Sequence, residues 1–384
     1  MVAVLTALSY GTGRFTMPAE ITLTDPTTHP TYGDGPISRW CAKHLYEARD
    51  EVFVRMTIKM VAMQVVLMGG LFAAIKWAPI PWIIPALAYF AIWGYFTPPI
   101  ILMLHCTMHR KFIQDPKWLE KAHPIVMSFF FGMPMGYREH HVGMHHVEDN
   151  MGQDLSSTIR YQRDSFANWL VYFFRFFFLS IVELPIYLRK KKRHQMARRA
   201  IIGEVLHMSI IALSMFIDWR FGLFAFLVPY LTCRFMMMVG NWGQHAFVNT
   251  GHKNNGIANA ITCINSGYNK RCFNDGYHVG HHLRANRHWT EMPKDFLDNR
   301  ELYAKEGAIV FEGLDFFLVS VLLWTGQWKT REALRAARRA DDRRGSDRDA
   351  QRAREAGACV ARREDRRRAV TQRVIRPTAR LRPR

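Results

Sequence analysis

The sequence predicts an all-α membrane protein, with two transmembrane helical hairpins (about four spans) beneath a cytosolic helical cap and interfacial helices. Two observations predict this class. Hydrophobic residues make up 49% of the 384 residues and are gathered into blocks, and about 20 helical residues suffice to cross a hydrocarbon core of ~30 Å. Histidine clusters follow these blocks, which indicates a shared polar surface where the spans end.

The first hairpin is predicted from two apolar blocks, Met56–Ile75 and Ile80–Leu104, each long enough to span. The joint Trp77–Trp82 contains prolines and tryptophans, which suit a tight turn at the lipid–water interface. His105 follows the second block directly, so the first histidine cluster lies where the chain leaves the membrane.

The second hairpin is predicted from Ile201–Ile217 and Phe221–Gly240, with Asp218–Gly222 as its turn. Asn241 and His245 follow at its end. Because each hairpin returns to the side from which it entered, all the histidine clusters are expected on one face of the membrane.

That face also carries the basic run Arg189–Arg193, so the positive-inside rule makes it cytosolic. The segment Phe166–Leu188 is long enough to span, but it contains Arg175, Glu183 and Pro185. If it crossed the membrane, the last histidine cluster would lie opposite the first two. We therefore expect it to lie on the cytosolic surface, as do the apolar stretches 123–136 and 308–326.

Three regions are predicted. Residues 1–50 form an N-terminal cytosolic segment, 51–327 the membrane domain, and 328–384 a basic tail that should be disordered. From Lys329 onward, 20 Lys and Arg stand against 8 Asp and Glu, which accounts for most of the formal net charge of +20. The tail lacks interleaved aromatics, so nucleic-acid binding is not expected; it is either dispensable or adheres to anionic lipid headgroups.

Nine histidines stand at spacings that a solvated or core histidine has no reason to adopt. Neutral imidazole binds Fe, Zn, Cu and Ni, and helical residues three or four apart share a face. Nine converging imidazoles are too many for one ion, so the pattern predicts a dimetal centre held by the cap and the interfacial helices. The predicted ligands are His105, His109, His141, His145, His146, His245, His278, His281 and His282.

Few carboxylates occupy ligand positions. Those that flank the clusters are expected to accept the outer N–H of an imidazole and orient it; they are Glu139, Glu148, Asp149, Asp154 and Asp275. A nitrogen-rich dimetal site favours a redox metal, with iron and O₂ the leading pair, and the membrane setting predicts a lipid substrate.

Some positions stay open. His140 is a second candidate for the first position of the middle cluster, although His141 has the better spacing to His145. Cys106 and Cys272 lie near ligand positions, but packing is the preferred interpretation for both. His207 falls within a predicted span and is not expected to be a ligand.

The three clusters read HxxxH, HxxxHH and HxxHH in that order, over roughly residues 50–300. In spacing, order and membrane placement the chain resembles the membrane fatty acid desaturases and their hydroxylase relatives. The resemblance implies two Fe ions, O₂ as co-substrate, and a four-helix membrane bundle under a cytosolic cap. It also implies electrons from an external carrier, of the cytochrome b5 or ferredoxin type.

A further likeness concerns the pair Asn241 and His245. In stearoyl-CoA desaturase-like enzymes a histidine before the last cluster is a ligand, and an asparagine four residues earlier holds a metal-bound water. The resemblance therefore implies that His245 is a ligand and that Asn241 acts through water. The chain departs from many front-end desaturases, because His278 stands where they have Gln. The stretch Asp154–Arg163 is unlike typical acyl-CoA desaturases, which leaves the substrate headgroup open.

The resulting hypothesis is a membrane-bound, O₂-dependent di-iron desaturase that places a double bond in a fatty acyl chain. A lipid hydroxylase or ketolase of the same superfamily is the first alternative, because cluster spacing does not separate these outcomes. A non-catalytic, metal-dependent membrane scaffold is the second, and zinc-dependent lipid hydrolysis the third. The expected location is the endoplasmic reticulum, with a plastid membrane as the alternative.

Overall fold

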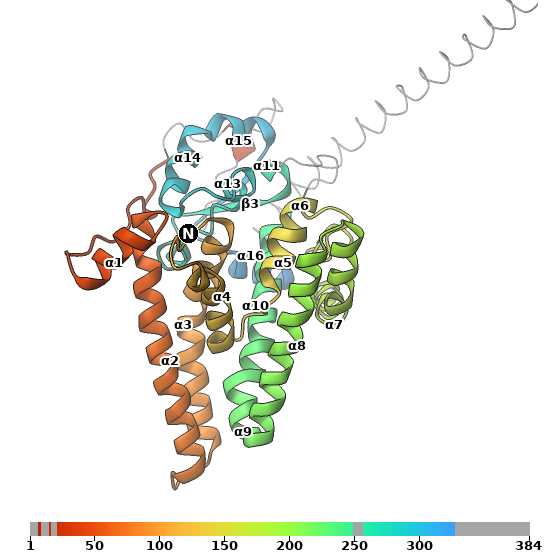
Figure 1. Cartoon of the computed structure of the whole chain (residues 1–384). Helices are drawn as coiled ribbons and strands as arrows, with labels where there is room; N and C mark the ends of the chain where they lie inside the picture. Colours follow the sequence, from red (N-terminus) through yellow and green to blue (C-terminus); the bar gives the residue numbers. More distant parts are fainter. Residues whose placement is uncertain (1–6, 9–14, 17–20, 249–255, 327–384) are drawn as a thin grey trace, which may run out of the picture. The chain divides into compact units, whose positions relative to one another are not determined.

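A computed structural model describes residues 7–8, 15–16, 21–248 and 256–326 (Figure 1). The described part is mainly helical, as predicted. The predicted basic tail, residues 328–384, lies outside the described residues. Within the described part, five helices are long and apolar enough to cross a membrane. They are Ala48–Trp77, Ile83–His109, Phe166–Lys190, His194–Ile217 and Trp219–Gln244.

Both predicted hairpins are present (Figure 1). Helix α2 (Glu51–Trp77) returns as α3 (Ile83–His109), and the turn contains the prolines and tryptophans that predict it. Helix α8 (His194–Ile217) returns through α9 (Trp219–Gly222), the π-helical η3 (Leu223–Leu227) and α10 (Val228–Gln244). Exposed apolar side chains such as Val66 and Phe216 cover the outer faces of these helices, as expected of surfaces that contact lipid.

The two turns are joined at the end of the bundle far from the histidines. The Asp218 carboxylate accepts hydrogen bonds from the backbone N–H groups of Arg220 and Phe221, so it caps α9. Lys76 Nζ at the end of α2 lies 2.7 Å from Asp218 Oδ2. One carboxylate thus caps a helix of the second hairpin and pairs with the first.

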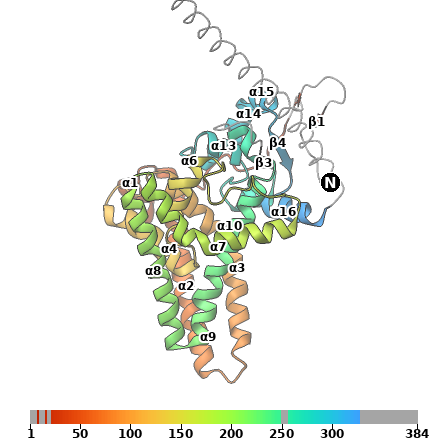
Figure 2. The ribbon, with the colours of Figure 1, turned by 90° about the vertical axis from the view of Figure 1, so that its right-hand side faces the viewer.

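The fifth apolar helix, α7 (Phe166–Lys190), is the segment predicted to lie on the membrane surface. Figure 2 shows it running across the direction of α8 and α10, whereas in Figure 1 it is viewed nearly along its axis. Its two internal charges pair, with Arg175 Nη2 3.1 Å from both oxygens of Glu183. Its orientation therefore agrees with an interfacial helix, although its length and composition would allow a span.

Between the hairpins lie shorter helices. The predicted surface stretch 123–136 overlaps α4 (Lys117–Phe131), which has 15 residues. The middle histidine cluster spans α5 (Tyr137–His140), the π-helical η2 (His141–His145) and α6 (His146–Glu148).

The stretch 308–326 is only partly helical. Residues Ile309–Glu312 form strand β4, which pairs in parallel with β3 (Ile261–Ile264), and only α16 (Phe316–Thr325) is a helix. The surface helix predicted over the whole stretch was therefore wrong at its start. Helix α16 packs closely on α10 at Gly243, which has no side chain. A Cβ at this position would lie 2.3 Å from the carbonyl oxygen of Phe316, so only glycine permits the approach.

The cap over the bundle is held to the N-terminal segment by a buried carboxylate. Asp25 Oδ2 accepts hydrogen bonds from the backbone N–H of Asn265, the Asn269 amide and the Tyr277 hydroxyl, at 2.7 to 3.0 Å. Tyr277 directly precedes the last histidine cluster, so the N-terminal segment helps to position it. The remaining elements are β1 (Ala7–Leu8), β2 (Phe15–Thr16), α1 (Pro36–His44), η1 (Ala48–Asp50), α11 (Gly256–Asn259), α12 (Gly267–Arg271), α13 (His278–Leu283), η4 (Trp289–Glu291), α14 (Met292–Asp298) and α15 (Arg300–Glu306).

We expect Asp218→Ala to destabilise the bundle by about 1–2 kcal/mol, because loss of a helix N-cap alone costs about that much. Asp218→Asn should cost less, since asparagine still caps the helix and only the charge toward Lys76 is lost. Thermal unfolding of the detergent-solubilised chain measures both, with the exposed Asp34→Ala as control. Equal melting temperatures for Asp218→Ala and the native chain would contradict the assignment.

Candidate metal centre

The structure brings all nine predicted histidines together, in two groups. His105 and His109 of α3, His141 and His146 of the middle cluster, and His281 of α13 form the five-histidine group. The four-histidine group consists of His145, His245, His278 and His282. Within each group, one ring nitrogen per residue lies within 4.8 Å of every other. Four separate segments of chain, α3, the middle cluster, the end of α10 and α13, therefore converge on two points.

A π-helical turn sorts the middle cluster between the groups. In η2 the backbone hydrogen bonds span five residues rather than four. His141 and His146, five apart, consequently face the same point, with their Nε2 atoms 3.2 Å apart. His145 belongs to the other group. Its ring still stacks on that of His141, with centroids 5.5 Å apart, so the two are neighbours as predicted but face different groups.

The last cluster achieves the same sorting in ordinary α-helix. His278 and His282, four apart, have Nε2 atoms 3.1 Å apart and belong to the four-histidine group. His281 faces the five-histidine group, where its Nε2 lies 3.0 Å from those of His105 and His146. The spacing HxxHH in an α-helix and HxxxHH in a π-turn thus produce equivalent arrangements.

The nitrogen separations fit a metal ion in each group. Five Nε2 pairs within the groups lie 3.0 to 3.3 Å apart. Ligand atoms at metal–nitrogen bond lengths of about 2.0–2.1 Å are separated by similar distances when their bonds make angles near 90–110°. His109 Nε2 is buried and has no hydrogen-bond partner among the described residues. Such a donor set could hold one ion per group.

Carboxylates orient several rings from outside. His145 Nδ1 donates to Asp154 Oδ2 at 2.6 Å, and His105 Nδ1 donates to Asp275 Oδ1 at 3.1 Å. His282 Nδ1 lies 2.9 Å from Asp149 Oδ1. A hydrogen bond at Nδ1 fixes the tautomer and leaves the Nε2 lone pair directed into the group.

The other two flanking carboxylates serve elsewhere. Glu148 accepts a hydrogen bond from the Tyr187 hydroxyl and pairs with Lys191 Nζ at 2.8 Å. Glu139 is buried, and its carboxylate makes no hydrogen bond or ion pair with a histidine ring within the described part of the chain. The prediction that all five carboxylates orient imidazoles therefore holds for three of them.

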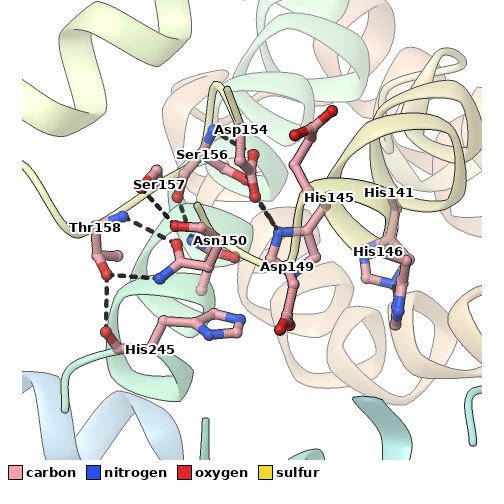
Figure 3. Close-up of polar contacts among 12 residues, drawn as sticks. His141, His145, His146, Asp149, Asn150, Asp154, Ser156, Ser157, Thr158 and His245 are labelled. Carbon is pink, nitrogen blue, oxygen red and sulfur yellow. Dashed lines mark hydrogen bonds and ion pairs between the residues drawn. The ribbon is translucent and has the colours of Figure 1, made fainter. Parts of the chain in front are cut away.

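The loop after the middle cluster connects the two sides of the four-histidine group (Figure 3). Asp154 is held by the Ser156 hydroxyl, and the amide of Asn150 donates to the Thr158 hydroxyl. Thr158 in turn donates to the backbone carbonyl of His245 at 2.8 Å. The unusual stretch after residue 154 thus supports this group rather than only joining helices.

Burial keeps these rings neutral, which is the form that binds a metal. Desolvation by burial lowers the pKa of His141, His146, His278 and His281 well below the usual value. Burial alone would raise the pKa of Asp154, but its interactions with His145 outweigh this and the pKa is lowered. Asp154 is therefore held as a carboxylate where it accepts the hydrogen bond of His145 Nδ1.

Asn241 lies on α10 one turn before His245 and makes two hydrogen bonds of its own. Its amide nitrogen donates to the Ser156 carbonyl at 2.8 Å and to the Tyr172 hydroxyl at 2.7 Å. These bonds fix the side chain beside the site, and its predicted water-mediated role stays a prediction.

The other residues considered as metal ligands lie outside both histidine groups. The His140 ring packs edge-on against Phe176, and the His207 ring lies 4.6 Å from that of Tyr230. Cys106 and Cys272 are free thiols that take part in neither group. The structure therefore places His141, and not His140, in a histidine group.

A cavity of about 390 Å³ lies against the histidines. His105, His141, His145 and His278 line it at the site, and helices α3, α7, α8, α10 and α16 supply its walls. Two charged residues in this lining, Glu204 and Arg234, lie within predicted spans and were missed by sequence reasoning. The available signal was the presence of charges within predicted spans, which are functional candidates by default.

We expect His109→Ala and His278→Ala each to lower the bound metal from two ions per chain toward one, because each removes a ligand from a different group. Metal analysis of the purified chain measures the ratio, with the exposed His194→Ala as control. Loss of all metal in both variants would still fit a two-ion centre, but it would contradict independent binding by the two groups. An unchanged metal content would contradict the assignment of His109 and His278 as ligands.

We expect Asp154→Asn to weaken metal retention about 10–100-fold, as loss of such an orienting partner does at other sites. Chelator competition against the native chain measures the change. Asp298→Asn, an exposed carboxylate paired with Lys294, is the matched control and should behave as the native chain.

We compared the sequence with known proteins and protein families. No curated protein matches the sequence. The family model described as fatty acid desaturase matches residues 82–313, which is more than half of the chain and includes both histidine groups. The chain belongs to the fatty acid desaturase family.

Proposed function

We propose that the protein is a membrane-bound, O₂-dependent di-iron desaturase that introduces a double bond into the acyl chain of a lipid. The observation that carries the proposal is that a cavity with mainly apolar walls lies against both histidine groups. The five-histidine group would hold one iron. The four-histidine group, with Asn241 acting through water, would hold the other.

Bound iron would supply the oxidising chemistry with O₂. The protein's contribution is to place a chain carbon beside the two groups and to exclude water. Apolar side chains such as Ile101, Leu184 and Met237 line the cavity and suit methylene groups. Because small changes in how the chain lies over the site decide between products, these side chains also govern desaturation against hydroxylation.

The electron balance requires a separate donor. Removing two hydrogens from a chain yields two electrons, whereas reduction of O₂ to two waters consumes four. The other two must come from a carrier such as a cytochrome b5 or a ferredoxin. The proposed location is the endoplasmic reticulum, with a plastid membrane as the alternative.

We expect a host that expresses the chain to accumulate a new unsaturated lipid, and a host that expresses His281→Ala to lack it. Lipid mass spectrometry measures the product, and His194→Ala should behave as the native chain. Hydroxylated products alone would replace desaturase by hydroxylase. Full product formation by His281→Ala would refute oxidation at these groups.

Metal analysis of the active preparation separates iron from zinc. Two irons per chain, with activity lost on iron removal and restored by iron, is the expected result. Release of fatty acid from lipid by a preparation that contains zinc alone would support lipid hydrolysis instead.

A further inference from the structure

Helices α8 and α10 carry an ion pair inside the predicted membrane region. Arg234 Nη2 donates to both carboxylate oxygens of Glu204 at 2.7 Å, and the Tyr230 hydroxyl also donates to Glu204. The Arg234 side chain is only 6% exposed. Charges at such depth are costly unless they are paired, and they commonly mark a functional site.

Both members of the pair line the cavity that reaches the histidines. Arg234 precedes Asn241 by seven residues on α10, so the two side chains share a helix face and lie about 10 Å apart along the axis. The cavity therefore has two polar regions, one at the histidines and one deeper in the bundle. Apolar wall separates them, including Met237 and Met238.

The guanidinium retains donor capacity. Arginine carries five N–H groups, and the recorded hydrogen bonds of Arg234 all use Nη2. Its Nε has no partner either, but it is buried within the protein and does not reach the cavity. Nη1 makes no hydrogen bond within the described residues, and it belongs to a side chain that lines the cavity. A plain hydrocarbon chain in the cavity would leave these donors unmet, and unmet buried donors cost free energy.

We propose that this pair recognises a neutral oxygen, a hydroxyl or a ketone, on the part of the substrate chain that reaches beyond the oxidised carbons. Glu204 already balances the charge of Arg234, so the pair offers hydrogen-bond donors with no net charge. That favours a neutral acceptor over a carboxylate. The inference deepens the proposed function and rests on it for the identity of the reacting chain.

The test measures binding rather than turnover, so that it stands apart from the proposed oxidation. The full-length chain in lipid nanodiscs is titrated with radiolabelled octadecanoic acid and with isomers that carry one hydroxyl at successive positions along the distal half. We expect one isomer to bind about tenfold tighter than octadecanoic acid, the gain typical of a hydrogen bond to a charged group. Binding of no isomer more tightly than octadecanoic acid overturns the proposal.

Two single variants separate recognition from a merely structural ion pair. Arg234→Met should abolish the preference for the hydroxylated isomer. Glu204→Gln leaves the arginine charge unbalanced, so it should shift the preference toward octadecanedioic acid, whose distal carboxylate is anionic. Arg175→Met, which breaks the pair with Glu183 on α7 outside the cavity lining, is the matched control and should keep the native preference. A preference that persists in Arg234→Met overturns the proposal.

A single variant can fail to fold, because an unpaired buried charge is strongly destabilising, whereas replacement of both partners by apolar residues is often tolerated. The double variant Glu204→Met with Arg234→Met then decides, and loss of its preference supports the proposal while retention overturns it. A preference without any lipid oxidation would instead reject the proposed function and leave the recognition intact.

Discussion

The described structure depends on directing nine imidazoles inward at two points. Rings with Nε2 atoms 3.0 to 3.3 Å apart bring lone pairs together, and only a shared cation or proton makes that arrangement favourable. The carboxylates at Nδ1 hold the rings in this orientation, and Asp154 and Asp275 come from loops far apart in sequence. The bundle beneath and the cap above therefore hold these distant loops at fixed positions around the histidines.

The sequence alone predicted the elements whose signal is local. The two apolar blocks and the joint between them predicted the first hairpin, and the ends of α2 and α3 lie two to five residues from the predicted ones. All nine histidines were identified from their spacing and later found together. The pairing of His141 with His146 was not predictable, because a π-turn cannot be distinguished from α-helix by residue spacing alone.

Features that depend on tertiary contacts could not be predicted from the sequence. Residues Ile309–Glu312 read as part of an apolar surface helix, but the partner strand β3 draws them into a short sheet. Glu204 and Arg234 stand thirty residues apart, and nothing local indicates that they meet inside the bundle. Glu148 flanks a histidine cluster in sequence, yet its partners Tyr187 and Lys191 lie on and just after α7. Closeness in sequence to a histidine cluster therefore predicted a contact with an imidazole correctly for only three of the five carboxylates.

The π-turn at His141–His145 has a consequence for how the family's motifs vary in length. One residue separates the middle cluster, HxxxHH, from the last cluster, HxxHH, yet both deliver two rings to one group and one to the other. A wider turn absorbs the additional residue within itself, so the helices on either side need not rotate. Insertion of a single amino acid, which elsewhere in a helix would turn every later side chain by about 100°, is confined here to one loop of backbone. Within this one chain, two clusters of different length thereby present the same division of rings.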